Sequence, residues 1–203
     1  MERKTATAAK LPVAVGRRLQ AGSGPGMCTI VHMRTLTGLD MNSFWETSDY
    51  ALREYVGPPC TPGLVAEVEL RLGHRLPEAY VALAMSQNGG MPARTSHRTN
   101  TRTSWAEDHI AITGIFSIGY DKPCSLCGER GSRFWVEEWG YPDIGVYFAD
   151  CPSAGHDMLC LDYRACGPQG EPSVVHVDQE LDYAITPVAP DFESFLRGLE
   201  DIG

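Results

Sequence analysis

The stretch at residues 64–90, LVAEVELRLGHRLPEAYVALAMSQNGG, indicates the fold class of this chain because it holds two amphipathic helices in succession. The first helix begins at Thr61-Pro62, which supplies an N-cap residue followed by proline at the first helical position. Three apolar side chains then recur at i, i+4 and i+8, namely Leu64, Val68 and Leu72. Gly73 ends this helix.

The second helix begins at Pro77 and ends at Asn88-Gly89-Gly90, where a left-handed C-cap forms easily. One of its faces carries residues at i, i+3, i+4 and i+7, namely Tyr80, Leu83, Ala84 and Gln87. Only three or four residues separate the two helices, so we expect them to form a helical hairpin.

Residues 93–104, ARTSHRTNTRTS, predict a loop because they are polar and lack any helical or strand period. The segment contains four basic or imidazole side chains, at Arg94, His97, Arg98 and Arg102. These side chains allow either an anion-binding loop or a solvated excursion. No glycine-rich phosphate cradle accompanies them, which favours the solvated excursion.

Short runs of β-branched and aromatic residues follow, separated by turn clusters, and predict an antiparallel meander. The runs are residues 110–118, 144–149, 158–163, 173–178 and 183–188. Residues 134–139 are ambiguous, with helical spacing slightly favoured. Asp191 then caps a short helix with apolar residues at helical spacing, namely Phe192, Phe195, Leu196 and Leu199. The sequence therefore predicts an α+β fold with an N-terminal helical hairpin, a curved antiparallel sheet of about five strands and a closing C-terminal helix.

The charge of the chain is unevenly distributed. Its 203 residues include 26 acidic and 17 basic ones, a net charge of −9. Residues 1–40 carry +4, whereas residues 41–203 carry −13, of which −11 lies in residues 131–203. An acidic chain lacks the excess of lysine and arginine that nucleic acids and anionic membranes attract, so neither is an expected partner.

The length predicts one domain with a tail. Residues 1–40 are basic and aperiodic and predict a flexible tail, which leaves residues 41–203 as a single domain. A mitochondrial presequence is the alternative for this tail, but the Gly/Pro break at residues 22–26 argues against it. Seven scattered cysteines, no apolar run typical of a secretory signal and no membrane-spanning run predict a reducing cytoplasmic location.

The cysteines give only weak signals of chemistry. Cys124 and Cys127 have the spacing of a zinc-binding or redox pair. No second ligand pair accompanies them, since Cys151 and Cys160 are separated by eight residues in and beside predicted strands. Ordinary reduced cysteines are therefore the favoured interpretation.

No complete catalytic constellation is evident. Ser153, His156 and Asp157 lie within one predicted turn, which cannot readily align a nucleophile, a base and an orienting group. His176 and Asp178 share one face of a predicted strand and could bind a metal, but the sequence assigns no third ligand. We therefore expect no enzymatic activity, no metal and no cofactor.

Aromatic residues flanked by carboxylates are the most distinctive feature. They occur in two segments and predict a partner-binding surface, formed by Trp105, Glu107, Asp108, Glu137, Glu138, Trp139, Tyr141 and Asp143. Aromatic anchors supply affinity and carboxylates steer a basic partner. In the alternative interpretation, Trp105, Trp139 and Tyr141 are core residues with solvated charges between them.

Several segments together resemble the Smi/Knr family of the SUKH superfamily over residues 44–200. They are the helix pair at residues 64–90, GIFSIG at 114–119, residues 141–164, GEPSVVHVDQE at 170–180 and the final DFESFLRGL. The resemblance implies a strongly bent sheet packed against helices. It carries over no catalytic residues, and it implies turn, cap or core roles for Gly73, Leu76, Pro77, Tyr80, Asn88, Gly89, Gly90, Gly145, Gly155 and Asp162.

Resemblance to this family also implies a protein-binding function. Bacterial members are inferred to be immunity proteins that neutralise polymorphic toxins, often nucleases, and fungal members regulate cell-wall synthesis. We therefore expect a non-enzymatic module whose acidic surface covers a basic toxin domain. The alternatives are a regulatory scaffold and, less favoured, a metal-assisted hydrolase using His109, His156 and His176 with nearby carboxylates.

Overall fold

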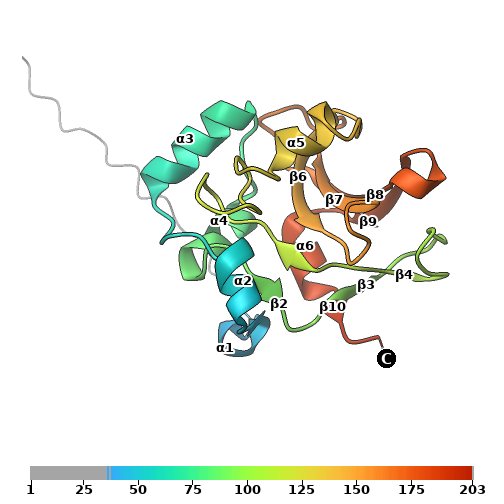
Figure 1. The fold of residues 1–203 in the computed structure, drawn as a ribbon, viewed down its shortest axis with the longest axis horizontal. Helices are drawn as coiled ribbons and strands as arrows, with labels where there is room; N and C mark the ends of the chain where they lie inside the picture. Colours follow the sequence, from blue (N-terminus) through green and yellow to red (C-terminus); the bar gives the residue numbers. More distant parts are fainter. Residues whose placement is uncertain (1–35, 37, 203) are drawn as a thin grey trace, which may run out of the picture. The chain divides into compact units, whose positions relative to one another are not determined.

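A five-stranded antiparallel sheet is the largest element of the computed structural model, which describes residue 36 and residues 38–202 (Figure 1). The strands lie in the order β5-β6-β7-β8-β9. They are β5 Gly114–Ile115, β6 Gly145–Asp150, β7 Asp157–Asp162, β8 Ser173–Asp178 and β9 Ala184–Ala189. The predicted antiparallel meander is confirmed, because consecutive strands are neighbours in this sheet.

The central strands are buried on both faces. Every residue of β7 is buried, and β6 and β8 each have five buried residues of six. Their sequences are therefore nearly continuous apolar runs rather than alternating ones. Helix α6, Phe192–Arg197, packs against β8 and β9, and α5, Ser132–Glu137, packs against β6.

Helix α3 spans Pro62–Leu72 and begins and ends at the residues that the sequence indicates. The Thr61 side chain accepts a hydrogen bond from the Leu64 backbone nitrogen, and Gly73 adopts a left-handed conformation with φ of 75°. Glycine has no Cβ and takes this conformation without strain. The capping residues predicted for this helix are thus in place.

Helix α4 spans Glu78–Ser86 and packs against α6, where the Tyr80 and Phe192 rings lie 4.7 Å apart. The predicted left-handed cap at Asn88-Gly89-Gly90 is wrong in its details, because Gln87 already follows the helix in an extended conformation. The buried Asn88 side chain instead accepts a hydrogen bond from the Ile118 nitrogen and donates to the carbonyls of Pro58 and Ile118. Asn88 therefore joins three chain segments.

The polar segment 93–104 is not entirely a loop, because it contains strand β3, Ser96–Arg98. This strand lies between β4, His109–Ala111, and β10, Leu199–Glu200. The short strand β10 follows α6 and is not predicted by the sequence pattern. The three-stranded sheet carries the loop at residues 99–108 toward one end of the molecule (Figure 1).

The N-terminal part of the described chain is built from short elements. Helix α1, Met41–Phe44, leads into β1, Trp45–Glu46, which pairs with β2, Met91–Pro92, and α2 follows at Asp49–Glu54. Except for residues 36 and 38–40, the predicted flexible tail at residues 1–40 lies outside the described residues. Leu36 is buried and Leu39 packs against the core, so the folded part begins before residue 41.

None of the helices formed by the described residues is long and apolar enough to cross a bilayer.

Candidate functional site

The loop at residues 99–108 exposes Trp105, whose side chain belongs to the first predicted binding segment. Strands β3 and β4 fix the two ends of the loop, since Arg98 is paired with His109. Within it, the buried Thr103 hydroxyl oxygen accepts a hydrogen bond from the Ala106 nitrogen, 3.2 Å away. Trp105 is 49% exposed, which is unusual for the largest apolar side chain.

A short 3-10 helix, η1 at Gln179–Leu181, connects β8 and β9. The Asp178 carboxylate caps it by accepting a hydrogen bond from the Leu181 nitrogen. Asp182 follows in the left-handed region with φ of 55°. This turn leaves Leu181 48% exposed between two exposed carboxylates, Glu180 and Asp182.

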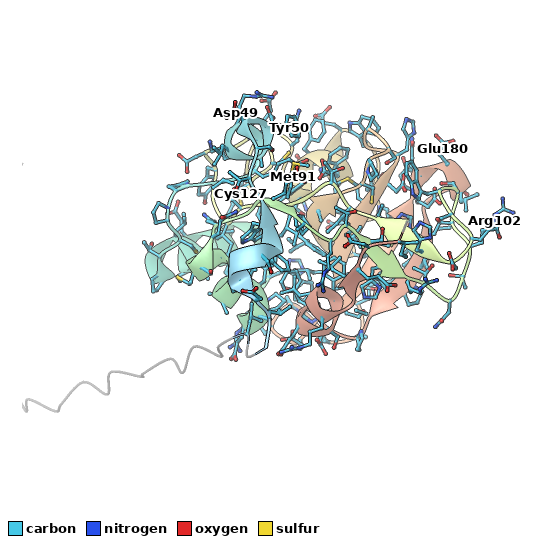
Figure 2. All side chains as sticks on the ribbon, turned by 90° about the horizontal axis from the view of Figure 1, so that it is seen from below. Asp49, Tyr50, Met91, Arg102, Cys127 and Glu180 are labelled. Carbon is cyan, nitrogen blue, oxygen red and sulfur yellow. The ribbon has the colours of Figure 1, made fainter. Side chains whose placement is uncertain are left out.

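Asp178 joins the loop to η1. Its buried carboxylate also accepts two hydrogen bonds from Ser104, from the backbone nitrogen at 2.8 Å and from the hydroxyl at 2.9 Å. The buried Asp178 carboxylate therefore lies between the segments that expose Trp105 and Leu181. We call this region the η1 surface and define it as Trp105, Glu107, Glu180, Leu181 and Asp182. Figure 2 shows Arg102 and Glu180 at the same end of the molecule, away from Asp49 and Tyr50.

The second predicted binding segment borders the η1 surface through His156. The Trp139 ring lies 6.2 Å from the His156 ring, edge to face, and the Tyr183 hydroxyl donates to the Trp139 carbonyl. His156 Nδ1 lies 2.7 Å from a carboxylate oxygen of Glu180. Trp139 is partly buried, so it supports this edge of the surface and presents only part of its ring.

The other members of the predicted surface differ in their placement. Glu137, Glu138 and Asp143 are exposed, and Glu137 and Asp143 both pair with Arg133. Tyr141 is only 2% exposed and its hydroxyl donates to the Gly155 carbonyl, so it is a core residue and not part of a binding surface.

Arginines neutralise part of the acidity of the loop. Arg102 pairs with Glu107 at 3.2 Å, and Arg98 pairs with Asp108 at 2.6 Å. Hydrogen bonding from His109, together with Arg98, lowers the pKa of Asp108. The acidic character of this end of the molecule therefore depends mainly on Glu180 and Asp182, which sequence analysis did not single out. Their exposure follows from the tight connection between β8 and β9. In the sequence, this connection is only the interval between the predicted strand runs 173–178 and 183–188.

A second polar group lies inside the sheet. Cys151, Asp157 and His176 are all buried, and one potential ligand atom from each lies within 4.8 Å of the other two. His176 Nε2 is 3.1 Å from Asp157 Oδ2, whereas the buried His176 Nδ1 has no hydrogen-bond partner among the described residues. Burial alone would raise the pKa of Asp157, but hydrogen bonds from His176 and Ser153 outweigh it and lower that pKa.

This arrangement brings His176 together with residues that the sequence analysis did not associate with it. Asp178 shares one face of β8 with His176, as predicted, and is paired with Asp157, but its carboxylate bonds to Ser104 and Leu181. His109 and His156 are not in the buried group, so the three histidines of the hydrolase alternative do not form a common site among the described residues. The register of three strands, which sequence alone does not give, determines this grouping.

A SMI1/KNR4 family model (SUKH-1) matches residues 59–198, which include α3, the five-stranded sheet, η1 and α6. The chain belongs to the SMI1/KNR4 family (SUKH-1). No curated protein matches the chain.

Two glycines of this SMI1/KNR4 chain show the backbone roles that the family resemblance implied. A Cβ on Gly145 would lie 1.9 Å from the Leu161 carbonyl oxygen, so only glycine allows β6 and β7 to approach there. Gly155 has φ of 98° and lies against Trp135 in the turn between these strands. In the same turn, the Ser153 hydroxyl oxygen accepts a hydrogen bond from the Asp157 nitrogen, as expected of a local turn.

The thiols of this SMI1/KNR4 chain are not set up as nucleophiles. Burial raises the pKa of both Cys124 and Cys127 to about 11. Burial, with the nearby Asp157, also raises the pKa of Cys151 well above its usual value. A thiol needs its deprotonated form to attack or to exchange disulfides, so these three are poor candidates for either reaction at neutral pH.

Proposed function

We propose that this SMI1/KNR4 chain is a non-enzymatic, immunity-type module that neutralises a basic toxin domain through the η1 surface. The observation that carries this proposal is that one buried carboxylate, Asp178, bonds to Ser104 and to the Leu181 backbone and so joins the two segments that expose Trp105 and Leu181. Backbone segments that are joined before binding lose less conformational freedom when a partner covers them. Tryptophan is also among the residues that most often dominate binding energy.

The charge around these anchors favours a cationic partner. Glu180 and Asp182 flank Leu181, and residues 131–203 carry −11 overall. A domain that acts on nucleic acid must be basic to hold phosphates, and an acidic inhibitor can compete for the same surface. Complementary charge also accelerates association.

The non-enzymatic part of the proposal is supported by the buried position of the Cys151–Asp157–His176 group. Four surface cavities found among the described residues are lined by other side chains, so they do not lead to these three. A catalytic nucleophile and base must reach substrate, and these groups have no such access through those cavities.

The direct test is co-expression of the chain with a basic toxin domain encoded beside it, combined with a binding measurement on the purified pair. We expect Trp105→Ala and Leu181→Ala each to weaken binding at least tenfold, as hot-spot truncations do. The matched controls are Tyr50→Ala and Leu52→Ala, because these apolar residues are 44% and 50% exposed and lie in α2. We expect the controls to retain wild-type affinity and protection.

Three outcomes separate the alternatives. Loss of binding in the α2 controls but not in the Trp105 and Leu181 variants would overturn the η1 surface as the binding site. Tight binding to a non-toxic partner, without any protection from toxin, would favour a regulatory scaffold. Unchanged protection by a variant that no longer binds the toxin would contradict neutralisation by direct contact.

A further inference from the structure

We propose that Cys151, Asp157 and His176 form a buried zinc site that closes the β6–β7 turn onto β8. The three residues offer a thiolate, a carboxylate and an imidazole, which are the ligand types that Zn²⁺ takes in proteins. All three are at most 4% exposed, and the atoms that would face an ion lie within 4.8 Å of one another. This spacing requires only small side-chain adjustments to surround one ion.

The strand register explains why the three side chains meet. Met158 of β7 is paired with Asp150 of β6. The strands are antiparallel, so Cys151, which follows Asp150, lies opposite Asp157, which precedes Met158. His176 of β8 is paired with Leu159, two residues after Asp157 and therefore on the same face of the sheet. The donors thus come from three adjacent, rigid segments, which is the kind of support that a metal site needs.

The placement of the His176 ring decides which of its nitrogens can bind the ion. His176 is 0% exposed, and its Nδ1 has no hydrogen-bond partner within the part of the chain that the structure describes, which is rare for a buried polar atom. Nε2 of the same ring lies 3.1 Å from Asp157 Oδ2, and the two nitrogens of an imidazole point away from each other, so an ion that takes Asp157 as a ligand coordinates His176 through Nε2.

Charge balance favours a divalent ion as well. A thiolate and a carboxylate together carry two negative charges, and neutral imidazole adds none, so a bound Zn²⁺ makes the group neutral. Neutrality matters because a net charge inside the sheet is strongly disfavoured. The buried location predicts a structural ion that is acquired as the chain folds and is then slow to leave.

The test is refolding of the full-length chain in the presence of zinc. Protein unfolded with denaturant and a chelator is refolded with Zn²⁺, with Mg²⁺ or with no added metal, then passed through a chelating column. We expect one zinc per chain only after refolding with Zn²⁺, and a Tm about 5 to 10 °C above that of the metal-free protein if free zinc exceeds Kd about a hundredfold. Zinc-refolded wild-type protein that keeps no zinc and shows no Tm shift would overturn the site.

Variants then locate the ion. Cys151→Ala and His176→Gln should abolish zinc retention and the zinc-dependent Tm shift. Cys160→Ala is the matched control, because Cys160 is equally buried but points to the opposite face of β7. Cys127→Ala tests the other thiol pair. Retention of zinc in Cys151→Ala, or its loss only in Cys127→Ala, would place the ion elsewhere and contradict the site.

A second measurement applies if Cys151→Ala and His176→Gln do not fold. Co²⁺ then replaces Zn²⁺, and the Co²⁺-thiolate absorption of wild-type protein is compared with that of Cys160→Ala and Cys127→Ala. Equal absorption in all three proteins excludes Cys160 and Cys127 as the thiolate ligand, whereas its loss in either variant would contradict the site.

Discussion

Ser104 donates two hydrogen bonds to Asp178, from a position 74 residues away in the sequence. The same carboxylate accepts a hydrogen bond from Leu181. One buried side chain thereby determines the position of both the loop that exposes Trp105 and the turn that exposes Leu181. Removing this anchor should affect stability and binding together.

Asp178→Asn tests the anchor. The amide has one acceptor oxygen where the carboxylate has two, so at least one of the three donors, two from Ser104 and one from Leu181, loses its partner. We expect the free energy of unfolding to fall by about 1–3 kcal/mol, measured by urea denaturation. Asp182→Asn makes the same chemical change at an exposed position and should stay within about 0.5 kcal/mol of wild type. Equal effects of the two substitutions would argue against a special role for Asp178.

Asn88→Asp should be among the most destabilising single-atom changes in the chain. Asn88 donates to the Pro58 and Ile118 carbonyls at 2.9 Å, and a carboxylate can donate to neither. It would also bury an unpaired charge against two carbonyl oxygens. We expect a loss of about 3 kcal/mol or more in chemical denaturation. Asn100→Asp, at an exposed loop position, is the control and should change stability by no more than about 0.5 kcal/mol.

The carboxyl of Asp150 should make stability depend on pH in an unusual direction. Burial raises the pKa of Asp150 to about 6, although the Tyr55 hydroxyl and the Gly114 nitrogen donate hydrogen bonds to it. Between about pH 4 and 6 the folded chain therefore binds this proton more tightly than the unfolded chain does, so the contribution of Asp150 to stability decreases as pH rises.

Asp150→Asn removes this titration and isolates the effect from other carboxylates. We expect the stability of the variant relative to wild type to increase by about 2–3 kcal/mol between pH 4 and pH 7, measured by denaturant unfolding at each pH. A difference that stays constant across this range would show that Asp150 titrates normally in the folded protein.

Association with the toxin domain should depend on ionic strength. Raising salt screens the carboxylates of the η1 surface, so the association rate constant should fall about tenfold or more between low and high salt in stopped-flow or biosensor measurements. The double variant Glu180→Gln/Asp182→Asn should reduce the salt dependence. Asp49→Asn, at the other end of the molecule in Figure 2, should not. A rate that does not change with salt for wild type would contradict electrostatic steering.

The sequence by itself determined much of the fold of this protein. The residues that cap α3, Thr61 and Gly73, and the β-branched runs of the sheet act locally, since backbone conformation and side-chain period depend on near neighbours. The family of the chain also follows from its sequence. The turn at Ser153 also follows from local residues, whereas the sequence leaves Trp105 either as a binding residue or as a core residue.

Only the tertiary structure decided which of these residues meet. Strand β3 forms within a polar segment because β4 and β10 supply its backbone partners. Tyr141 is buried because its ring packs against Tyr147 and Tyr183, and the Gly155 carbonyl accepts the hydrogen bond of its hydroxyl. The joining of Ser104 to Asp178, and of His176 to Asp157 and Cys151, depends on strand register and loop path. Register is determined by packing across the whole sheet, and spacing along the sequence does not encode it.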